Sequence, residues 1–372
     1  MPLPETEQAP KPRPAIARLV PYSPGKPIED VKREYGLTDV IKLASNENPL
    51  GPSPKAVAAM KDALDGVNLY PDGAAVSLKQ ALSNYWDLPA GQFTLGNGSD
   101  EVIHCLGLAY LRPGDAIVHG DPSFSLYGAA ALLNEAEAIK VPLTPDMRHD
   151  LDAMADAVDE RTRMVFIANP NNPTGGMNTG REIEDLMDRL PPRVLLVLDE
   201  AYAEYVESPE YPASIEYVRE GRPVIVLRTF SKIYGIAGLR VGYGMARPDI
   251  IAAVEQVREP FNVNSLAQAG ALAALSDTEH LNRSRRVNAE GKRTLMAAFD
   301  RLGLPYAATE GNFILVDTKR PCREVYEALL RKGIIVRTGD IFGLPTWIRV
   351  TIGTPEENAR FLQGLESIVT GA

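Results

Sequence analysis

Lys232 is the residue of this sequence best suited to covalent chemistry. It follows a strand-like apolar run at 223–230 and lies beside two hydroxyl residues, Thr229 and Ser231, with Arg240 eight positions further on. A lysine near a sheet edge, among other cations, can lose its proton readily and form a Schiff base with an aldehyde. Hydroxyl groups together with an arginine suit a phosphate dianion. The alternative is a lysine in a surface loop, which is the usual place for this residue type.

Asp199 is a second candidate, because it ends the apolar run RVLLVLD at 193–199. Its carboxylate is expected at the buried carboxyl edge of a sheet, where a charge is unfavourable unless a cation pairs with it. A protonated pyridine nitrogen is one such cation. The alternative is that Asp199 only caps the helix that follows the strand.

Two motifs of small and amide residues could bind the oxygens of a ligand. GNGSDE (96–101) is predicted to open a helix, whose free amides and dipole favour an anion. It is not a dinucleotide fingerprint, because Glu101 stands where the third glycine would be. NPNNPTGG (169–176) follows the run RMVFIA, and its asparagine amides can donate to a ligand oxygen. Each motif alone is equally typical of a structural cap or turn.

The elements around these residues predict one sheet that brings them together. Strand-like runs alternate with amphipathic helical stretches, which indicates an α/β fold with a mostly parallel sheet and helices on both faces. Ligands of such folds bind beyond the carboxyl ends of the strands. The strand-like runs are 116–120, 163–169, 193–199 and 223–230, and the helical stretches include 151–160 and 181–190.

The pattern changes after about residue 260 and predicts a smaller α+β domain. A long helical stretch at 267–303 is followed by strand candidates at 312–318, 333–338 and 346–353, with a helix at 322–333. We expect residues 45–265 to form the large domain and residues 15–44 and 266–372 to form the small one. Residues 1–14 are rich in proline and charge, and we expect them to be a mobile tail.

Composition excludes several classes of function. The net charge of −10 disfavours nucleic-acid binding, which needs clustered lysine and arginine. The two cysteines, Cys105 and Cys322, are far apart and form no CxxC motif, so we expect no metal site and a reducing, cytoplasmic location. We also expect no membrane partner, because the sequence has no secretory signal and no apolar run of about 18 residues.

Taken together, the motifs resemble the fold-type I pyridoxal-phosphate (PLP) aminotransferases. NPTG, DEAY and SKxxGxAGLRxGY occur in the order and at intervals like those of that family. The resemblance covers nearly the whole chain, from LASNENPLGPSP (43–54) to RVTIGTPEEN (349–358). It implies pyridoxal 5'-phosphate as cofactor, a small-molecule amino donor and a 2-oxo acid as substrates, and a homodimer with a shared active site.

The resemblance also implies a role for each matching residue. Lys232 would bind the cofactor and carry a proton, Asp199 would keep the pyridine nitrogen protonated, and Arg349 would clamp a substrate carboxylate. The other implied cofactor contacts are Asn172 and Tyr202 at the phenolic oxygen, Phe124 on the ring face, Gly98, Ser99, Asp100, Thr229, Ser231 and Arg240 around the phosphate, and Tyr70 at the phosphate of the partner subunit. The other implied substrate contacts are Tyr22, Asn46 and Arg337.

A narrower resemblance is to the branch of this family that acts on histidinol phosphate. It is carried by YPDG (70–73), PSFSLY (122–127), IIVR (334–337) and IRVTIGTPEEN (348–358). It implies transamination of L-histidinol phosphate with 2-oxoglutarate, giving imidazole acetol phosphate and glutamate in histidine biosynthesis.

Three alternatives stay open at this point. An aromatic amino-acid aminotransferase would differ only in its side-chain pocket. A PLP decarboxylase or lyase is weakly disfavoured by Arg349, because decarboxylation must release the carboxylate. A non-catalytic regulator with a DNA-binding module is disfavoured by the acidic chain and by the short, proline-rich N-terminus.

Overall fold

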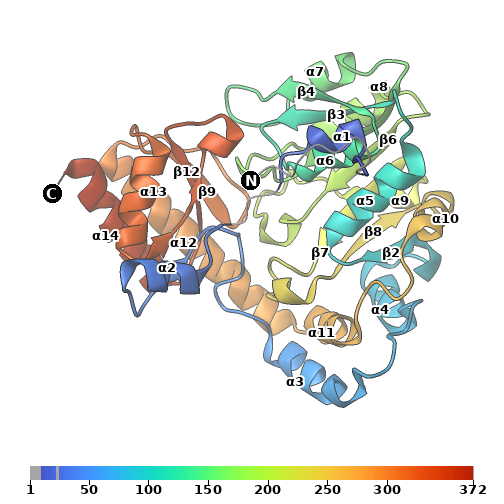
Figure 1. The fold of residues 1–372 in the computed structure, drawn as a ribbon. Helices are drawn as coiled ribbons and strands as arrows, with labels where there is room; N and C mark the ends of the chain where they lie inside the picture. The colour runs from blue at the N-terminus through green and yellow to red at the C-terminus, as the bar shows by residue number, and fades with distance from the viewer. Residues whose placement is uncertain (1–9, 22–24, 372) are drawn as a thin grey trace.

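A seven-stranded sheet forms the centre of the larger lobe (Figure 1). The computed structural model describes residues 10–21 and 25–371. Strand β8 runs antiparallel to both of its neighbours, and the remaining pairs are parallel, so the mostly parallel sheet expected from the sequence is confirmed. In spatial order the strands are β2 (Phe93–Gly96), β8 (Gly242–Ala246), β7 (Val224–Thr229), β6 (Leu195–Asp199), β5 (Thr162–Ala168), β3 (Ala116–Asp121) and β4 (Glu137–Pro142).

Helices cover both faces of this sheet. Successive residues of its central strands point to opposite faces and therefore pack into two different cores. In β6, Leu196 and Leu198 belong to one core, whereas Leu195 and Val197 belong to the other. The first core is shared with α3 (Pro54–Ala63), α4 (Val76–Trp86), α7 (Leu151–Asp156), α8 (Gly180–Arg189), α9 (Ser214–Arg219) and α11 (Ser265–Leu275). The second core is shared with α5 (Ser99–Tyr110), α6 (Leu126–Leu133) and α10 (Pro248–Val257).

The smaller lobe is built on an antiparallel three-stranded sheet with its own core. The sheet has the order β11 (Arg337–Thr338), β12 (Trp347–Thr351) and β9 (Phe313–Asp317). Three helices complete this lobe, namely α12 (Thr278–Leu302), α13 (Cys322–Arg331) and α14 (Pro355–Thr370). Short 3-10 turns occur at Leu64–Gly66, Ala90–Gln92, Ala203–Tyr205, Ala237–Leu239 and Asp340–Phe342.

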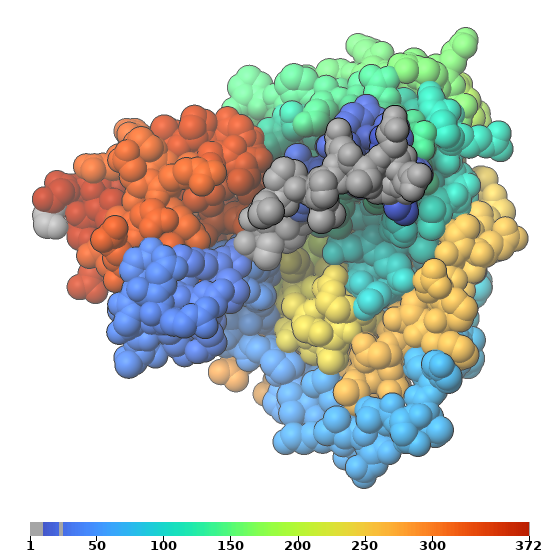
Figure 2. Space-filling view, in the orientation of Figure 1, coloured from blue at the N-terminus to red at the C-terminus, as the bar shows by residue number. Residues whose placement is uncertain are grey.

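The N-terminal segment contacts both lobes. Strand β1 (Ile41–Lys42) pairs in parallel with β10 (Ile334–Ile335), and α2 (Ile28–Tyr35) contacts α13. Figure 2 shows this blue segment against the orange and red lobe. The short helix α1 (Pro14–Ala17) instead contacts α6 beside the large sheet. The division at residues 45 and 265 stays a prediction.

Two expected elements differ from the observed ones. The helical stretch at 267–303 is two helices, because Asp277 accepts a hydrogen bond from the His280 amide and begins α12 anew. The expected strand at 333–338 is divided between two sheets, with β10 pairing to β1 and β11 pairing to β12. Within the described ranges, none of the helices combines the length and the apolar character needed to cross a membrane.

Candidate active site

A cavity of about 460 Å³ opens at the carboxyl ends of the three central strands. Ala168, Asp199 and Thr229 are the last residues of β5, β6 and β7, and all three line it. The candidates from the sequence that line this cavity are Asn46, Ser99, Asp100, Phe124, Asn172, Asp199, Tyr202, Thr229, Ser231, Lys232, Arg240 and Arg349. The parallel strands thus bring motifs that are far apart in sequence to one edge.

Lys232 lies just beyond β7 and points its amine into this space. Its Nζ donates a hydrogen bond to the backbone oxygen of Ser45 at 3.2 Å and lies 5.4 Å from the centre of the Tyr202 ring. The side chain is half-buried, and among the described residues its amine donates a hydrogen bond only to this backbone carbonyl. The amine is therefore within reach of a ligand in the cavity.

Asp199 faces the same cavity from the end of β6. Its Oδ2 accepts a hydrogen bond from the Tyr127 hydroxyl at 2.7 Å, whereas its buried Oδ1 has no hydrogen-bond partner among the described residues. Burial raises the pKa of Asp199 to about 6, although the Tyr127 hydrogen bond acts in the opposite direction. A buried carboxylate oxygen without a partner favours a cationic donor, and the protonated ring nitrogen of PLP fits that requirement.

The other end of the cavity is suited to a phosphate. Helix α5 begins at Ser99, and Gly98 before it has φ +85°, a backbone conformation that favours glycine. A side chain at Gly98 would place its Cβ 2.5 Å from Nη2 of Arg240. Arg240 donates to Asp100 at 3.2 Å and to Ser231 at 3.4 Å. The helix amides, the hydroxyl and the guanidinium together fit a phosphate dianion.

The middle of the cavity has an aromatic side and an amide side. Phe124 meets Tyr127 edge to face, with ring centres 5.6 Å apart. On the other side, the Tyr202 hydroxyl accepts a hydrogen bond from the Asn46 amide at 3.0 Å. Asn172 accepts a hydrogen bond from Arg349. A flat ring between these groups would have an aromatic contact and hydrogen-bond partners along one edge.

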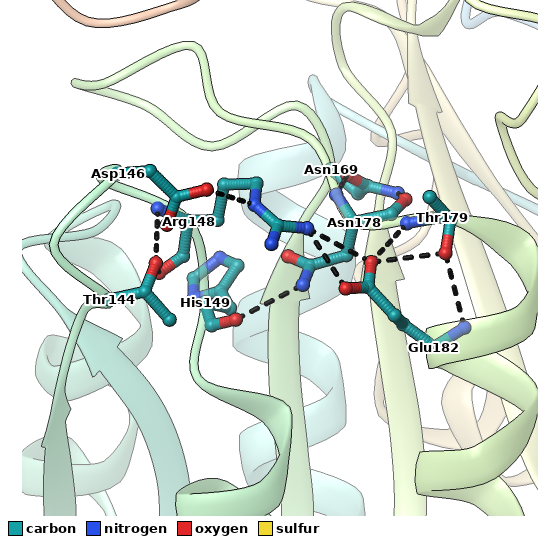
Figure 3. Close-up of polar contacts among 8 residues, drawn as sticks. All are labelled: Thr144, Asp146, Arg148, His149, Asn169, Asn178, Thr179 and Glu182. Atoms are coloured by element: carbon teal, nitrogen blue, oxygen red, sulfur yellow. Dashed lines mark hydrogen bonds and ion pairs between the residues drawn. The ribbon is translucent and has the colours of Figure 1, made fainter.

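A polar network holds the loop that carries Asn172 (Figure 3). Asn169 donates to the backbone oxygen of Asn178 at 2.9 Å, and the Asn178 amide donates back to the Asn169 side chain at 2.9 Å. The Asn178 side chain donates in turn to the backbone oxygen of His149 at 3.0 Å. Burial lowers the pKa of His149 to about 4, so this ring is neutral. The network closes both ends of the loop and thereby fixes the position of Asn172.

Arg349 and Arg337 are directly opposite each other on β12 and β11. Arg349 is buried, donates to the backbone oxygen of Ala44 at 2.6 Å and lies 5.3 Å from the centre of the Phe313 ring. Arg337 is half-buried and lies outside the lining of the cavity. Because opposite residues of an antiparallel pair share one face of the sheet, both side chains project to the same side.

Two of the remaining candidates, Gly98 and Tyr70, are not among the residues that line the cavity. Gly98 precedes the lining residue Ser99, and its lack of a side chain leaves room for Arg240. Tyr70 is 82% exposed and stacks on Phe261, with ring centres 4.8 Å apart. Tyr22 lies outside the described residues.

The sequence analysis missed several residues that line the cavity. Tyr127 is the important one, since it bonds directly to Asp199. It belongs to the motif PSFSLY, which carries the narrower resemblance, but it lies on α6 while Phe124 precedes that helix, so the sequence singled out the segment and not the role of this tyrosine. The others are Ser45, Leu126, Ala168, Pro170 and Ala201.

Comparison with known proteins gives a consistent result at three levels. Residues 38–365 match the family described as aminotransferase class I and II. The chain is 55% identical over 361 residues to a histidinol-phosphate aminotransferase of Moorella thermoacetica, covering 97% of this chain and 93% of that protein. It is 49% identical to one from Symbiobacterium thermophilum, covering 95% and 98% of the two chains. The crystal structure of the Sinorhizobium meliloti histidinol-phosphate aminotransferase in complex with pyridoxal-5'-phosphate is similar, with a TM-score of 0.89 and 26% identity over 98% of this chain and 100% of that one.

Proposed function

The chain belongs to the aminotransferase class I and II family, and on this premise we propose that it transfers an amino group from L-histidinol phosphate to 2-oxoglutarate with PLP as its cofactor. The products are imidazole acetol phosphate and glutamate, and the reaction is a step of histidine biosynthesis. The observation that carries this proposal is one cavity in which an amine, Lys232, faces an unpartnered carboxylate oxygen of Asp199 and a phosphate-binding helix start. The identity of the substrate is inferred from the similar proteins, which are named histidinol-phosphate aminotransferases.

PLP supplies an electron sink that withdraws charge from the substrate's α-carbon. Lys232 binds the cofactor and afterwards carries a proton to and from that carbon as a general acid and base. Asp199 keeps the ring nitrogen protonated, and Asn172 and Tyr202 hydrogen-bond the phenolic oxygen. Arg240 binds the phosphate at the start of α5, together with Ser99, Asp100, Thr229 and Ser231.

The two arginines opposite each other on β11 and β12 account for the two kinds of substrate. Histidinol phosphate has a hydroxymethyl group in place of a carboxylate, and its anion is a phosphate, whereas glutamate has two carboxylates. Arg349 binds the α-carboxylate of glutamate, and Arg337 adds the second cation that a phosphate or a second carboxylate requires. Asn46 and Tyr22 complete the substrate side.

A homodimer explains the exposed apolar surface around Tyr70. Seven large apolar side chains in α4, in α11 and in segments beside these helices and α3 are between 38% and 82% exposed. They are Leu64, Val67, Leu69, Tyr70, Val76, Phe261 and Leu272. Several exposed large apolar side chains in neighbouring segments are typical of a protein interface. A second copy of the chain covers it, and Tyr70 reaches the phosphate site of that copy.

The two cysteines support a reducing compartment, and we place the enzyme in the cytoplasm. Cys105 and Cys322 are both buried and unpaired. Burial raises the pKa of Cys105 to about 11, which disfavours the reactive thiolate.

The experiment that tests the proposal compares two amino donors. The purified enzyme is loaded with PLP and mixed with L-histidinol phosphate or L-phenylalanine, and the loss of the cofactor's yellow absorbance is followed for each single half-reaction. We expect histidinol phosphate to react with the higher kcat/KM, and 2-oxoglutarate to restore the colour. A preference for phenylalanine would make the chain an aromatic amino-acid aminotransferase, and no reaction with either donor would remove the proposal.

A further inference from the structure

The carboxylate of Asp199 is held by a single buried side-chain hydroxyl. Tyr127 lies on α6 with no exposed surface, and its hydroxyl donates to Oδ2 of Asp199 at 2.7 Å. The second oxygen, Oδ1, is equally buried and has no hydrogen-bond partner among the described residues. The two oxygens of one carboxylate are therefore unequal, since Oδ2 bonds to a tyrosine hydroxyl while Oδ1 is buried without a partner among the described residues.

We propose that Tyr127 is a positioning residue for cofactor binding, and that its hydroxyl keeps the Asp199 carboxylate charged and turned with Oδ1 toward the ring nitrogen of PLP. This inference rests on the proposed function only in taking PLP as the ligand; it does not depend on which amino donor the enzyme uses.

Two physical effects give the hydroxyl this role. A hydrogen bond to Oδ2 removes the freedom of the carboxylate to rotate, so Oδ1 is directed before the cofactor arrives. The same bond favours the charged form of Asp199, whereas burial and the nearby Asp100 favour the neutral form. A neutral acid cannot hold a pyridinium by charge, so the bond strengthens the pairing that keeps the ring cationic.

The tyrosine ring is fixed by contacts that do not involve its hydroxyl. It stacks on Phe166, with ring centres 4.7 Å apart and planes at 22°. It also meets Phe124 edge to face at 80° and His119 at 66°, with ring centres 5.6 Å and 6.2 Å away. Replacement of Tyr127 by phenylalanine would keep this aromatic packing and remove only the oxygen that touches Asp199.

The test uses two cofactors that differ at one atom. Cofactor-free wild type and Tyr127→Phe are each titrated with PLP and with 1-deaza-PLP, in which a C–H group replaces the ring nitrogen, and dissociation constants are measured by equilibrium dialysis. Tyr243→Phe is the matched control, because Tyr243 is as buried as Tyr127 but its hydroxyl accepts from Trp86 at 3.1 Å, outside the cavity.

If Tyr127 acts through Asp199, removal of its hydroxyl should weaken the binding of only the cofactor that has a ring nitrogen. We expect Tyr127→Phe to weaken PLP binding about tenfold, as the loss of a hydrogen bond to a charged group allows, and to leave 1-deaza-PLP nearly unchanged. Tyr243→Phe should change neither. In an Asp199→Asn background, Tyr127→Phe should no longer alter the ratio of the two constants.

Several results would overturn the inference. If Tyr127→Phe weakened the binding of PLP and of 1-deaza-PLP equally, the hydroxyl would only support the fold. A Tyr127→Phe protein too unstable to titrate would lead to the same conclusion. Equal affinity of the wild type for both cofactors would show that Asp199 does not bind the ring nitrogen. A failure of the proposed function can be told apart from a failure of this inference. A wrong amino donor would show in the comparison of histidinol phosphate with phenylalanine and would not change the ratio of the dissociation constants for PLP and 1-deaza-PLP.

Discussion

Replacement of Asp199 by asparagine should stabilise the cofactor-free protein while weakening its cofactor binding. Asp199 is 6% exposed, and one of its carboxylate oxygens lacks a partner in the described structure. Asparagine has nearly the same shape, and its carbonyl oxygen can still accept the hydrogen bond from Tyr127. The substitution therefore removes a buried charge and keeps the main contact.

The pKa of Asp199 sets the size and the pH dependence of this gain. Burial raises the pKa from 3.8 to about 6 in the folded protein. Between these values the folded protein holds a proton that the unfolded chain has released, so its free energy of unfolding falls as the pH rises through this window. Above it, the ionised carboxylate costs up to about 3 kcal/mol, which asparagine does not incur. Allowing for an imperfectly bonded amide, we expect a gain of about 1–3 kcal/mol at pH 8, roughly half of that at pH 5, and none near pH 4.

Urea unfolding of both cofactor-free proteins at pH 8 and pH 5 measures this difference, at one fixed protein concentration because oligomers gain stability with concentration. Asp249→Asn is the control, since the Arg247 guanidinium lowers the pKa of Asp249 and its charge is favourable; this variant should gain nothing at pH 8. The reasoning is wrong if Asp199→Asn is less stable than the wild type at pH 8, or if its advantage is the same at both pH values.

Three further outcomes concern catalysis, specificity and assembly. Lys232→Ala should lose at least about a thousandfold in kcat while still binding PLP, and borohydride should fix the cofactor to the wild type but not to this variant; labelling of another lysine would contradict the assignment. Arg337→Ala should weaken kcat/KM for histidinol phosphate by about 2 kcal/mol and leave phenylalanine nearly unchanged, and equal losses would argue against a phosphate contact. Phe261→Asp should shift sedimentation from dimer to monomer and abolish activity, and a fully active monomer would remove the shared site.

The sequence was sufficient for the central parallel strands of the large sheet and for most of the cavity. Strands β5, β6 and β7 are apolar at nearly every position because both of their faces are buried, and that pattern is visible without a structure. Since the next residues must lie at the carboxyl edge, Asp199, Lys232 and Asn172 could be placed together. Strands β2, β4 and β8 were not predicted. FTLG (β2) and GYGMA (β8) are short and contain glycine, and EAIKVP (β4) is mostly exposed and carries charged residues.

What could not be predicted depends on contacts between distant segments. The hydrogen bond between Tyr127 and Asp199 joins residues 72 positions apart. From the sequence alone, a tyrosine in an apolar helix is expected only to pack in the core. The divided strand at 333–338 results from pairing with β1, which no local pattern reveals. Tyr70 was assigned by resemblance alone, and the site that it would complete belongs to a second copy of the chain.

The polar groups of the cavity differ in how well they are satisfied before any ligand binds. Arg349 already donates to Asn172 and to the backbone of Ala44, and the Asn46 amide already donates to Tyr202. A substrate anion at Arg349 therefore replaces an existing neutral acceptor and gains only the difference between the two bonds. Among the described residues, the Oδ1 atom of Asp199 accepts no hydrogen bond, so a cationic ring nitrogen that donates to it displaces no existing donor. This imbalance suits an enzyme that retains its cofactor through every cycle and exchanges its substrates.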